Sequence, residues 1–465
     1  MINKKFSEII SFLKKNKLYK QNFHNKFVFY SKDNCSGKIF VSINMNQKTQ
    51  KKYIIEAIEN GAKAIILDQK IKIPNTFKNI PILYSKELKN NYNEFFNYIY
   101  SEPLNKMTVI GVTGTDGKTS QLHILAQCFS LSGDKIGVIS SEGNGIYPKL
   151  QSTDYTTPRI DILYKYFYFF KTKRVNKILI ECSSQGLEQD RLINIKFDIS
   201  ILTNINKDHI EHHKSIKNYI KSKFKLMNMT KKHIFLNQDC KRTKKNIKLI
   251  TSKAKQHLYN SHINLDLYKI KIPQTISNLY NLRATYEILK IYKFSSQSIL
   301  ELFNKLKPVN GRNQFIKTKN KGIYIIDYAH TPSSLLTLLK EIRIYASINS
   351  SKIITVFGCG GNRDVWKRKE MGRISSVFSD YIILTDDNPR NEKPMKILND
   401  IKQGIKITKK VFLIPSRKKA IYKAISLAEK NDYIIIAGKG NENSIMYKGH
   451  KLAHNDYEIL RSRIK

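Results

Sequence analysis

Short apolar runs alternate with longer amphipathic stretches along most of this 465-residue chain. A short apolar run bounded by polar or Gly-rich residues is typical of a buried strand, whereas apolar residues three or four positions apart indicate a helix. Strands that alternate with helices in this way form largely parallel sheets joined by crossover helices. The pattern therefore predicts an α/β protein.

The pattern separates into three blocks, at residues 1–104, 105–311 and 312–465. Strands are predicted at 38–43, 64–67, 107–112, 135–140, 177–182, 199–203, 323–327, 353–357, 381–385 and 433–437. Helices are predicted at the Lys-rich N-terminus, from Tyr53 to near Gly61, after residue 120, and at 218–227. Ligands of such sheets bind beyond the carboxyl ends of the strands, so we expect the functional residues there.

The segment GVTGTDGKTS, residues 111–120, stands between a predicted strand and a predicted helix. A Gly-rich loop in this context binds phosphate, because its backbone N–H groups approach the oxygens and the helix N-terminus adds partial positive charge. Lys118 can reach the terminal phosphates and Thr119 can bind Mg²⁺. Val112 occupies the first glycine position of the longer GxxxxGK[ST] pattern. The loop predicts an ATP-driven enzyme, and an ordinary Gly-rich turn is the alternative.

Two other predicted strands end in polar residues. Glu181 closes the strand KILIE and precedes CSSQGLEQDR, where a carboxylate can hold Mg²⁺. His209 follows the strand at 199–203, within the segment NKDHIEHH. The residues alone leave two interpretations of His209: it is a metal ligand, or it is a solvent-exposed histidine of a loop. The helix that follows carries several lysines, and the residues alone do not distinguish one of them.

The net charge of +45 is high, and Lys is spread over nearly every segment. Such charge is typical of proteins that bind nucleic acid, yet no nucleic-acid-binding signature accompanies it, so we expect solvated faces and no nucleic acid partner. The five cysteines lack CxxC spacing, which argues against a zinc site or a disulfide framework. We find no membrane-spanning stretch and no cleavage site at the amphipathic N-terminus, and we expect a cytoplasmic protein without membrane insertion.

Further motifs follow the phosphate loop in the order TTP, ECSSQGLEQDR, TNINKDHIEHH, YIKSK, SNLYNLRA, NGR, DYAHTP, GCGGNRD, DDNPR and GKGNE. This order resembles the Mur ligase family from about residue 107 to the C-terminus, and DYAHTP with DDNPR is most similar to members that add meso-diaminopimelate. The resemblance implies three domains. They are a small N-terminal α/β domain that binds UDP (1–104), a central P-loop ATPase domain with a parallel-rich sheet (105–311), and a C-terminal Rossmann-like α/β domain that binds the amino acid (312–465).

The resemblance also implies roles for individual residues. ATP binding falls on Gly114, Thr115, Asp116, Gly117, Lys118, Thr119, Ser120, Asn281, Arg312 and Asp327. Binding of the UDP-muramoyl dipeptide falls on Ser31, Gln47, Thr156, Thr157, Ser183, Gln189 and Arg191. Diaminopimelate binding falls on Arg363, Asp387, Asn388, Pro389, Arg390, Gly438 and Glu442. The metal ligands are Thr119, Glu181, His209 and Lys223 as a carbamate, and the catalytic set is Lys118, Glu181, His209, Lys223 and Arg312.

The reaction that the resemblance implies is an ADP-forming amide ligation in peptidoglycan precursor synthesis, with ATP and Mg²⁺ as cofactors. The glutamyl carboxylate of UDP-N-acetylmuramoyl-L-Ala-D-Glu is phosphorylated, and the amine of meso-diaminopimelate then displaces phosphate from the acylphosphate. Arg390 can grip the distal carboxylate of diaminopimelate, and Glu442 can meet its ammonium group. Lysine lacks that carboxylate, so such a site rejects it. We expect a monomer.

Several alternatives remain open. A lysine-adding Mur ligase or a folylpolyglutamate-synthetase-like ligase has the same architecture, although DNPR argues against both. A basic P-loop ATPase that binds nucleic acid would explain the net charge, and a decayed protein would retain the fold without ligation. The chain also departs from the family at Asp116, which puts a negative charge beside the phosphates, and at Asn441, which replaces a histidine.

Overall fold

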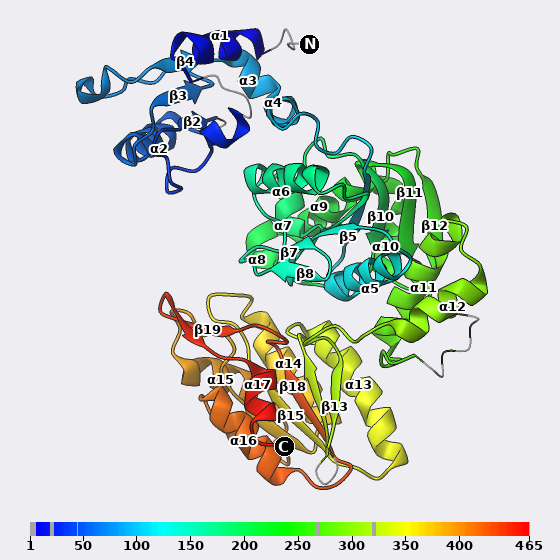
Figure 1. Ribbon diagram of the computed structural model, residues 1–465. Helices are drawn as coiled ribbons and strands as arrows, with labels where there is room; N and C mark the ends of the chain where they lie inside the picture. Colours follow the sequence, from blue (N-terminus) through cyan, green and yellow to red (C-terminus); the bar gives the residue numbers. More distant parts are fainter. Residues whose placement is uncertain are drawn as a thin grey trace. The chain divides into compact units, whose positions relative to one another are not determined.

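The computed structural model describes residues 6–18, 23–43, 45–263, 265, 267, 270–318 and 322–464 (Figure 1). It contains three parallel-rich sheets, one in each of three domains, which confirms the predicted α/β fold class. The chain forms two compact units, one of residues 1–108, 158–176 and 190–195, and one of the remaining residues. The domain boundaries at 104 and 311 stay predictions.

The first unit is built on a four-stranded parallel sheet in the order β1-β2-β3-β4. Its elements are α1 (Ser7–Lys15), η2 (Phe23–Lys26), β1 (Phe27–Val28), β2 (Ile39–Ser42), α2 (Gln47–Glu59), β3 (Ala64–Leu67), η3 (Asn75–Phe77), β4 (Ile82–Tyr84), α3 (Lys86–Asn90), α4 (Tyr92–Ile99) and α6 (Ile160–Thr172). Helix α2 begins before the predicted Tyr53, because the Asn46 side chain accepts a hydrogen bond from the backbone N–H of Thr49 and caps it.

Aromatic packing brings α6 into the first unit. The ring of Phe96 on α4 packs against those of Phe29 and Tyr164, with centroids 4.7 and 5.1 Å apart. The Tyr164 hydroxyl also donates a hydrogen bond to Asn97 Oδ1 at 3.0 Å. These contacts join a helix from the middle of the sequence to the N-terminal residues, which local pattern does not predict.

The second unit contains an eight-stranded sheet in the order β12-β11-β10-β5-β9-β6-β7-β8. Its strands are β5 (Thr108–Thr113), β6 (Ile136–Ser140), β7 (Gly143–Ile146), β8 (Lys149–Gln151), β9 (Lys177–Glu181), β10 (Phe197–Leu202), β11 (Thr230–Asn237) and β12 (Lys255–Tyr259). Its helices are α5 (Lys118–Leu131), α7 (Ser184–Glu188), α8 (Ile210–His213), α9 (Ile216–Asn228), α10 (Lys241–Asn246), η4 (Ile247–Leu249), α11 (Ile276–Ile291) and α12 (Ser296–Lys305). Strand β5 lies between β9 and β10, so the phosphate loop follows a central strand.

The same unit contains a six-stranded sheet in the order β13-β14-β18-β15-β16-β17, in which only β13 pairs antiparallel. Its strands are β13 (Gln314–Lys317), β14 (Ile323–Asp327), β15 (Ile353–Phe357), β16 (Tyr381–Leu384), β17 (Lys410–Leu413) and β18 (Tyr433–Ala437), followed by the hairpin β19 (Ser444–Tyr447) and β20 (His450–Ala453). Its helices are α13 (Pro332–Ile348), α14 (Trp366–Phe378), α15 (Pro394–Lys402), α16 (Arg417–Leu427) and α17 (Asp456–Arg461).

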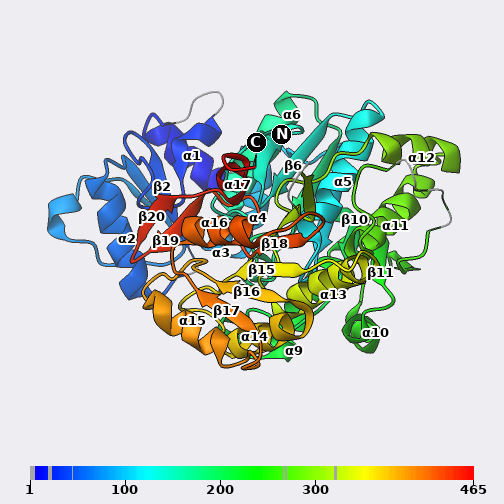
Figure 2. The same ribbon diagram turned by 90° about the horizontal axis from the view of Figure 1, so that it is seen from below.

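Helices cover both faces of this six-stranded sheet (Figure 2). Ile325 packs in one core with side chains of α13, α14 and α15, whereas its neighbours Tyr324 and Ile326 pack in a second core with α16 and α17. Successive strand residues point to opposite faces, so one apolar run supplies both cores. Within the described residues, no helix has the length and apolar content needed to cross a membrane.

Candidate active site

The phosphate loop turns from β5 into α5 through two glycines with positive φ, Gly114 at 154° and Gly117 at 79°. A Cβ on Gly114 would lie 1.9 Å from Thr203 Oγ1, so the tight approach requires glycine. Lys118 Nζ folds back over the loop and donates to the carbonyl of Thr115 at 2.9 Å. The loop therefore has a cation and a helix N-terminus at its concave side, as phosphate binding requires.

Thr119 and Glu181 meet at the start of α5. The Thr119 hydroxyl lies 3.1 and 3.2 Å from the two oxygens of the Glu181 carboxylate, which is 2% exposed. The same carboxylate accepts hydrogen bonds from the backbone N–H and hydroxyl of Ser141, both at 3.0 Å. Arg312 Nη2 lies 3.3 Å from the Thr119 hydroxyl. A buried carboxylate and hydroxyl beside a phosphate loop are oxygen donors that fit Mg²⁺.

Lys223 on α9 is almost fully buried under the same loop. Its Nζ donates to the carbonyl of Gly114 at 2.6 Å and lies 4.4 Å from the centroid of the Tyr219 ring. Burial and the nearby Lys118 ammonium group hold the pKa of Lys223 well below its ordinary value, although Asp208 opposes the shift. A lysine amine that loses its proton readily can react with CO₂, so the position fits a carbamate.

His209 stands at the start of α8 in the left-handed region, with φ of 53°. Its ring lies 3.2 Å from Asp208 and 3.9 Å from Glu211. Glu181 ends β9 and His209 follows β10, and β5 lies between these two strands. The two predicted metal ligands are therefore on opposite sides of the phosphate loop, and the contacts of His209 are with its own segment.

Residues predicted to bind adenosine lie on both sides of the loop. Asn281 on α11 is buried beside Gly117, and its Nδ2 has no hydrogen-bond partner among the described residues. Asp327 ends β14 and accepts hydrogen bonds from the backbone N–H groups of Asn313 and Ala329, both at 2.7 Å. Burial raises the pKa of Asp327.

A small hollow lies beside Arg312. It is lined by Ser120, Ile124, Ile272, Pro273, Asn278, Pro308, Val309 and Arg312. Among these residues, Ser120, Asn278 and Arg312 belong to the sequence motifs, whereas the apolar residues do not.

Tyr328 contacts one residue predicted to bind ATP and one residue predicted to bind diaminopimelate. The Arg312 guanidinium lies 4.0 Å from the centroid of its ring, and its hydroxyl donates to Glu442 at 3.1 Å. The Glu442 carboxylate also accepts from Lys439 Nζ at 2.6 Å and from Asn388 Nδ2 at 3.2 Å. The Glu442 carboxylate is therefore held in place by three donors.

Arg390 and Arg363 border Gly360, where a Cβ would lie 2.9 Å from Arg390 Nη1 and 3.5 Å from Arg363 Cγ. Arg390 has a positive φ of 53°, and its guanidinium donates to the carbonyl of Gly361 at 2.8 Å. Burial and the nearby Arg363 lower the pKa of Arg390. The positive charges of Arg363 and Arg390 repel each other, so the arrangement favours an anion beside them.

The rest of the predicted diaminopimelate loop packs closely around this pair. The Asp387 carboxylate faces Gly438, where a Cβ would lie 2.9 Å from its Oδ2. The carbonyl of Pro389 approaches Gly361, where a Cβ would lie 1.9 Å away. Neither glycine position has room for a side chain unless the loop moves.

The predicted dipeptide-binding residues are divided between the two units. Ser31, Gln47 and Arg191 lie in the first unit, and Thr156, Thr157, Ser183 and Gln189 lie in the second. The buried Ser31 hydroxyl donates to Glu56 at 2.6 Å, whereas Gln47 is exposed at the start of α2.

Within the second unit, the Thr157 hydroxyl bridges β9 to α7. It donates to the carbonyl of Glu181 at 2.7 Å and accepts from the backbone N–H of Ser183 at 2.9 Å. Ser183 caps α7 in turn, because its hydroxyl accepts from the backbone N–H of Gly186.

Comparison with known proteins shows the family to which this chain belongs. The Mur ligase middle domain matches residues 112–291, and the glutamate ligase domain of Mur ligases matches residues 311–440. A relative from Wigglesworthia glossinidia brevipalpis, named UDP-N-acetylmuramoyl-L-alanyl-D-glutamate–2,6-diaminopimelate ligase, is 34% identical over 95% of this chain and 94% of its own length. The chain belongs to the Mur ligase family. A relative of the same name from Buchnera aphidicola subsp. Schizaphis graminum is 33% identical over 91% of this chain and 92% of its own.

Solved structures agree with the family assignment. A ligase bearing the same name matches with a TM-score of 0.60 and 27% identity, over 94% of both chains. The MurF ligase from Thermotoga maritima in complex with ADP also has a TM-score of 0.60, over 90% of this chain and 95% of its own, but at 16% identity it shows the fold alone. Mur ligases are ATP-dependent ligases that form amide bonds, so the predicted enzyme class is confirmed.

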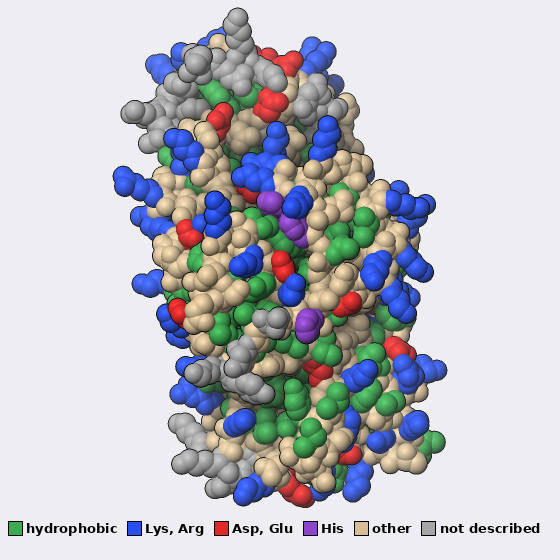
Figure 3. All heavy atoms as spheres, turned by 90° about the vertical axis from the view of Figure 1, so that its right-hand side faces the viewer, with side chains coloured by type: hydrophobic (Ala, Val, Ile, Leu, Met, Phe, Trp, Pro, Cys, Tyr) green, Lys and Arg blue, Asp and Glu red, His purple; other side chains and the backbone are tan. Residues whose placement is uncertain are grey.

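Family membership also weighs against the nucleic-acid-binding ATPase. Lys and Arg side chains are dispersed over the face drawn in Figure 3, between polar and hydrophobic side chains, instead of forming one continuous stripe. A protein that follows a nucleic acid backbone needs such a stripe or groove. On this face the positive charge is typical of solvated surface.

Several residues of this Mur ligase site escaped the sequence motifs. Ser141 follows β6 and holds Glu181. Tyr219 is part of the YIKSK motif, but the motif did not predict that its hydroxyl lies 2.8 Å from Thr115 Oγ1 of the phosphate loop. Glu142 lies 3.9 Å from Arg312 and accepts a hydrogen bond from Asn441, and burial raises its pKa. Ser141 and Glu142 lie at the carboxyl end of a strand, and this position could have indicated that they belong to the site.

Asp116 has several hydrogen-bond donors in this Mur ligase. Its carboxylate accepts from Asn206 Nδ2 at 3.0 Å and from the hydroxyls of Ser333 and Thr331 at 3.2 and 3.4 Å. The last two residues begin α13, where the helix dipole also favours a negative charge. The predicted charge beside the phosphates is thus satisfied by the start of the C-terminal domain.

Proposed function

We propose that this Mur ligase joins meso-diaminopimelate to UDP-N-acetylmuramoyl-L-Ala-D-Glu in an ADP-forming step of peptidoglycan precursor synthesis. The observation that carries the proposal is the pair Arg363 and Arg390 beside Gly360, with Glu442 hydrogen-bonded to Asn388 of the same loop. The relatives that bear this enzyme's name over more than nine-tenths of the chain support it.

The proposed amino-acid site distinguishes diaminopimelate from lysine by charge. The arginine pair binds the distal carboxylate with charge-assisted hydrogen bonds, and Glu442 binds the distal ammonium group. Lysine supplies the distal ammonium group without the distal carboxylate, so it leaves the two arginines without their ligand anion. A site whose charged partners are left unpaired discriminates strongly against such an analogue.

In the first chemical step, a carboxylate oxygen of the substrate's glutamyl group attacks the γ-phosphorus of ATP, and the bond to ADP breaks. Lys118 binds the transferring phosphoryl group, and the phosphate-loop N–H groups hold the nucleotide in line. Arg312 lies beside Thr119 and can neutralise the charge that develops there. The product of this step is an acylphosphate and ADP.

In the second step, the amine of diaminopimelate attacks the acyl carbon, phosphate leaves, and an amide remains. Thr119 and Glu181 would hold Mg²⁺, which spreads negative charge on the phosphates when it is bound. His209 and Lys223 as a carbamate complete the proposed ligand set on the other side of the loop. The low pKa of Lys223 supports the carbamate, because only the neutral amine reacts with CO₂.

The proposal also assigns the nucleotide and dipeptide groups. The adenosine part of ATP is bound near Asn281, Arg312 and Asp327, and the unpartnered Asn281 Nδ2 within the described residues supports this placement. The dipeptide end of the UDP-linked substrate is bound near Thr157 and Ser183, at the carboxyl end of β9 where Glu181 stands. The contacts of Ser31 and Gln47 with uridine, the monomeric state and the cytoplasmic location stay predictions.

The deciding experiment measures phosphate release from ATP and Mg²⁺ in the presence of UDP-N-acetylmuramoyl-L-Ala-D-Glu, with meso-diaminopimelate or L-lysine, and confirms the product by mass. We expect release that depends on both substrates and a tripeptide mass with diaminopimelate alone. Product with lysine would overturn the specificity argument. ATP binding without product from either amino acid would favour a decayed enzyme.

A further inference from the structure

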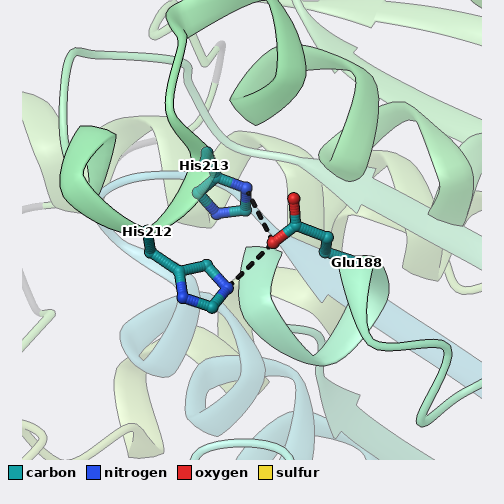
Figure 4. A group of neighbouring side chains, drawn as sticks. All are labelled: Glu188, His212 and His213. Carbon is teal, nitrogen blue, oxygen red and sulfur yellow. Dashed lines mark ion pairs between the residues drawn. The ribbon is translucent and has the colours of Figure 1, made fainter. Parts of the chain in front are cut away.

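A second cluster of metal-ligating side chains lies on α7 and α8 and shares no residue with the proposed Mg²⁺ site. Glu188 ends α7, and His212 and His213 end α8 (Figure 4). His212 Nε2 lies 2.8 Å and His213 Nδ1 lies 3.2 Å from the same oxygen, Glu188 Oε2. The three donor atoms all lie within 4.8 Å of one another.

The two imidazole nitrogens are buried and point at the carboxylate, yet neither makes a hydrogen bond of acceptable geometry within the described residues. The other ring nitrogen of His213, Nε2, lies 3.0 Å from the Ser184 hydroxyl. When Nε2 donates to Ser184, Nδ1 presents a lone pair, and a histidine whose other nitrogen donates to a neighbour is typical of metal-bound histidines. Burial also lowers the pKa of His213, which keeps the ring neutral.

We propose that Glu188, His212 and His213 bind a divalent transition-metal ion of the Zn²⁺ type. Zinc takes imidazole nitrogen and carboxylate oxygen at about 2.0–2.2 Å, which places tetrahedral ligand atoms roughly 3.3 Å apart. The 2.8 and 3.2 Å separations require a small adjustment of Glu188, which is partly exposed. A water molecule takes the fourth position.

The ligand set selects against Mg²⁺, which the ligase reaction uses. Mg²⁺ prefers oxygen ligands in octahedral geometry, whereas two imidazoles favour zinc, copper, nickel or cobalt. This site therefore stays available to zinc in a Mg²⁺ solution that saturates Thr119 and Glu181. It rests on the positions of the three side chains alone, so it stands whether or not the proposed ligase substrates are right.

The metal would join α7 to α8 next to the phosphate loop. The His213 ring packs edge-on against Tyr219, with centroids 5.2 Å apart, and the Tyr219 hydroxyl contacts Thr115 of the loop. The backbone carbonyl of His213 accepts from Asn218 Nδ2 at 3.1 Å. The ion would therefore have a structural role, because it would hold α7 and α8 together close to Tyr219.

The chain provides a matched control in a second histidine pair. His233 Nδ1 and His257 Nε2 lie 3.0 Å apart on the neighbouring strands β11 and β12. The two rings also contact each other, with centroids 5.2 Å apart, but this pair belongs to no group of three possible ligands within the described residues. Removing it tests whether paired imidazoles alone hold zinc.

The experiment strips the full chain with a chelator, adds saturating Mg²⁺ and then titrates Zn²⁺, measuring bound zinc per chain by elemental analysis after dialysis. We expect one retained zinc in the wild type and in His257→Gln, and its loss in His212→Phe and Glu188→Gln. Thermal unfolding and binding of ADP with Mg²⁺ check that each variant is folded. Co²⁺ in place of Zn²⁺ should give absorption bands of nitrogen–oxygen coordination that the same two variants lose.

Retention of zinc by both His212→Phe and Glu188→Gln would overturn the proposal, as would a wild type that holds no zinc in Mg²⁺. Zinc lost only from His257→Gln would place the ion on the strand pair instead. If His212→Phe does not fold, Glu188→Gln decides, because the partly exposed Glu188 is the member least involved in packing. The ligase assay is separate, so failure of the zinc site and failure of the proposed reaction are distinguishable.

Discussion

The phosphate loop and the arginine pair of the C-terminal domain differ in the groups that surround their charged side chains. Around the loop, opposite or polar groups already meet: Thr119 bonds Glu181, and Lys118 bonds a backbone carbonyl. Around Arg390, burial and a second cation, Arg363, lower the pKa of the guanidinium, while Asp387 and Glu442 offset part of that effect. The first region holds its carboxylate with hydroxyl groups, whereas the second places two arginines near the same glycine.

This difference indicates where affinity and selectivity arise. A site whose groups are already satisfied loses little when a ligand is absent, and it acts mainly by orienting the phosphates. A site with close like charges gains most from the one ligand that neutralises them. We therefore expect changes at the loop to reduce kcat, and changes at the arginine pair to raise the KM for the amino acid.

The largest effect is expected for Lys118→Ala. Loss of the cation that contacts the transferring phosphoryl group should lower kcat for phosphate release by about 10²–10³-fold. The measurement is steady-state phosphate release with both substrates saturating. An unchanged kcat with a raised KM for ATP would break the comparison, because the loop would then act through affinity alone.

Lys223→Ala should lower kcat by roughly 10²-fold, because it removes the proposed carbamate ligand from beside the loop. Lys221→Ala, an exposed lysine on the same helix, is the matched control and should retain full activity. Added formate should restore part of the activity of Lys223→Ala by supplying a carboxylate in the vacated space. Equal losses in the two variants would contradict a specific role for Lys223.

The pH dependence of Lys223 follows from its lowered pKa. Because the pKa lies well below the ordinary value, the neutral amine that reacts with CO₂ is present at lower pH than for an exposed lysine. Activity at limiting bicarbonate should therefore persist toward neutral pH. A profile that rises only near the ordinary pKa of lysine would contradict this shift.

Arg390→Lys should raise the KM for meso-diaminopimelate by about 10- to 100-fold, because a single ammonium group replaces charge-assisted bidentate contacts. The KM for ATP should change little. Arg373→Ala, which removes an exposed arginine paired with Glu370, serves as the control. A large rise in the KM for ATP in Arg390→Lys would show that the two regions are not separate in function.

The smallest effect concerns a buried carboxylate outside both regions, Glu341 on α13. Burial raises its pKa to about 7 from 4.5, so the folded state binds this proton more tightly than the unfolded state. Its contribution to stability is present below pH 4.5 and is lost as the pH rises through 7. Glu341→Gln should therefore be more stable than the wild type at pH 8, by about 1–2 kcal/mol after solvent screening, and similar at pH 4. Thermal unfolding at the two values tests this.

Much of the fold was predictable because it depends on local spacing. The predicted strands at 64–67, 323–327, 353–357 and 433–437 coincide with β3, β14, β15 and β18, and the lysine-bearing helix at 218–227 lies within α9. Most of the strands that escaped are edge strands or parts of short hairpins, and the internal strand β11 escaped as well. β7 has the sequence GNGI and β20 the sequence HKLA, so their apolar periodicity is weak.

In the candidate site, too, residues that are neighbours in the chain were predictable, whereas contacts between distant segments were not. The loop residues from Gly114 to Ser120 are adjacent in the chain, so the motif alone names them. The partners Ser141, Tyr219 and Tyr328 come from other segments, and no local pattern indicates that they meet Glu181, Thr115 and Arg312. Such contacts follow from how the sheets and helices pack.

By itself, the sequence determined the alternation of strands and helices, the phosphate loop and several of the residues at the strand ends, because these features depend on the spacing of neighbouring residues. The tertiary structure alone decided that α6 joins the N-terminal residues, that Asp116 is satisfied at the start of α13, and that Glu188 meets two histidines. These contacts join segments far apart in the chain, and only packing of the whole molecule brings them together.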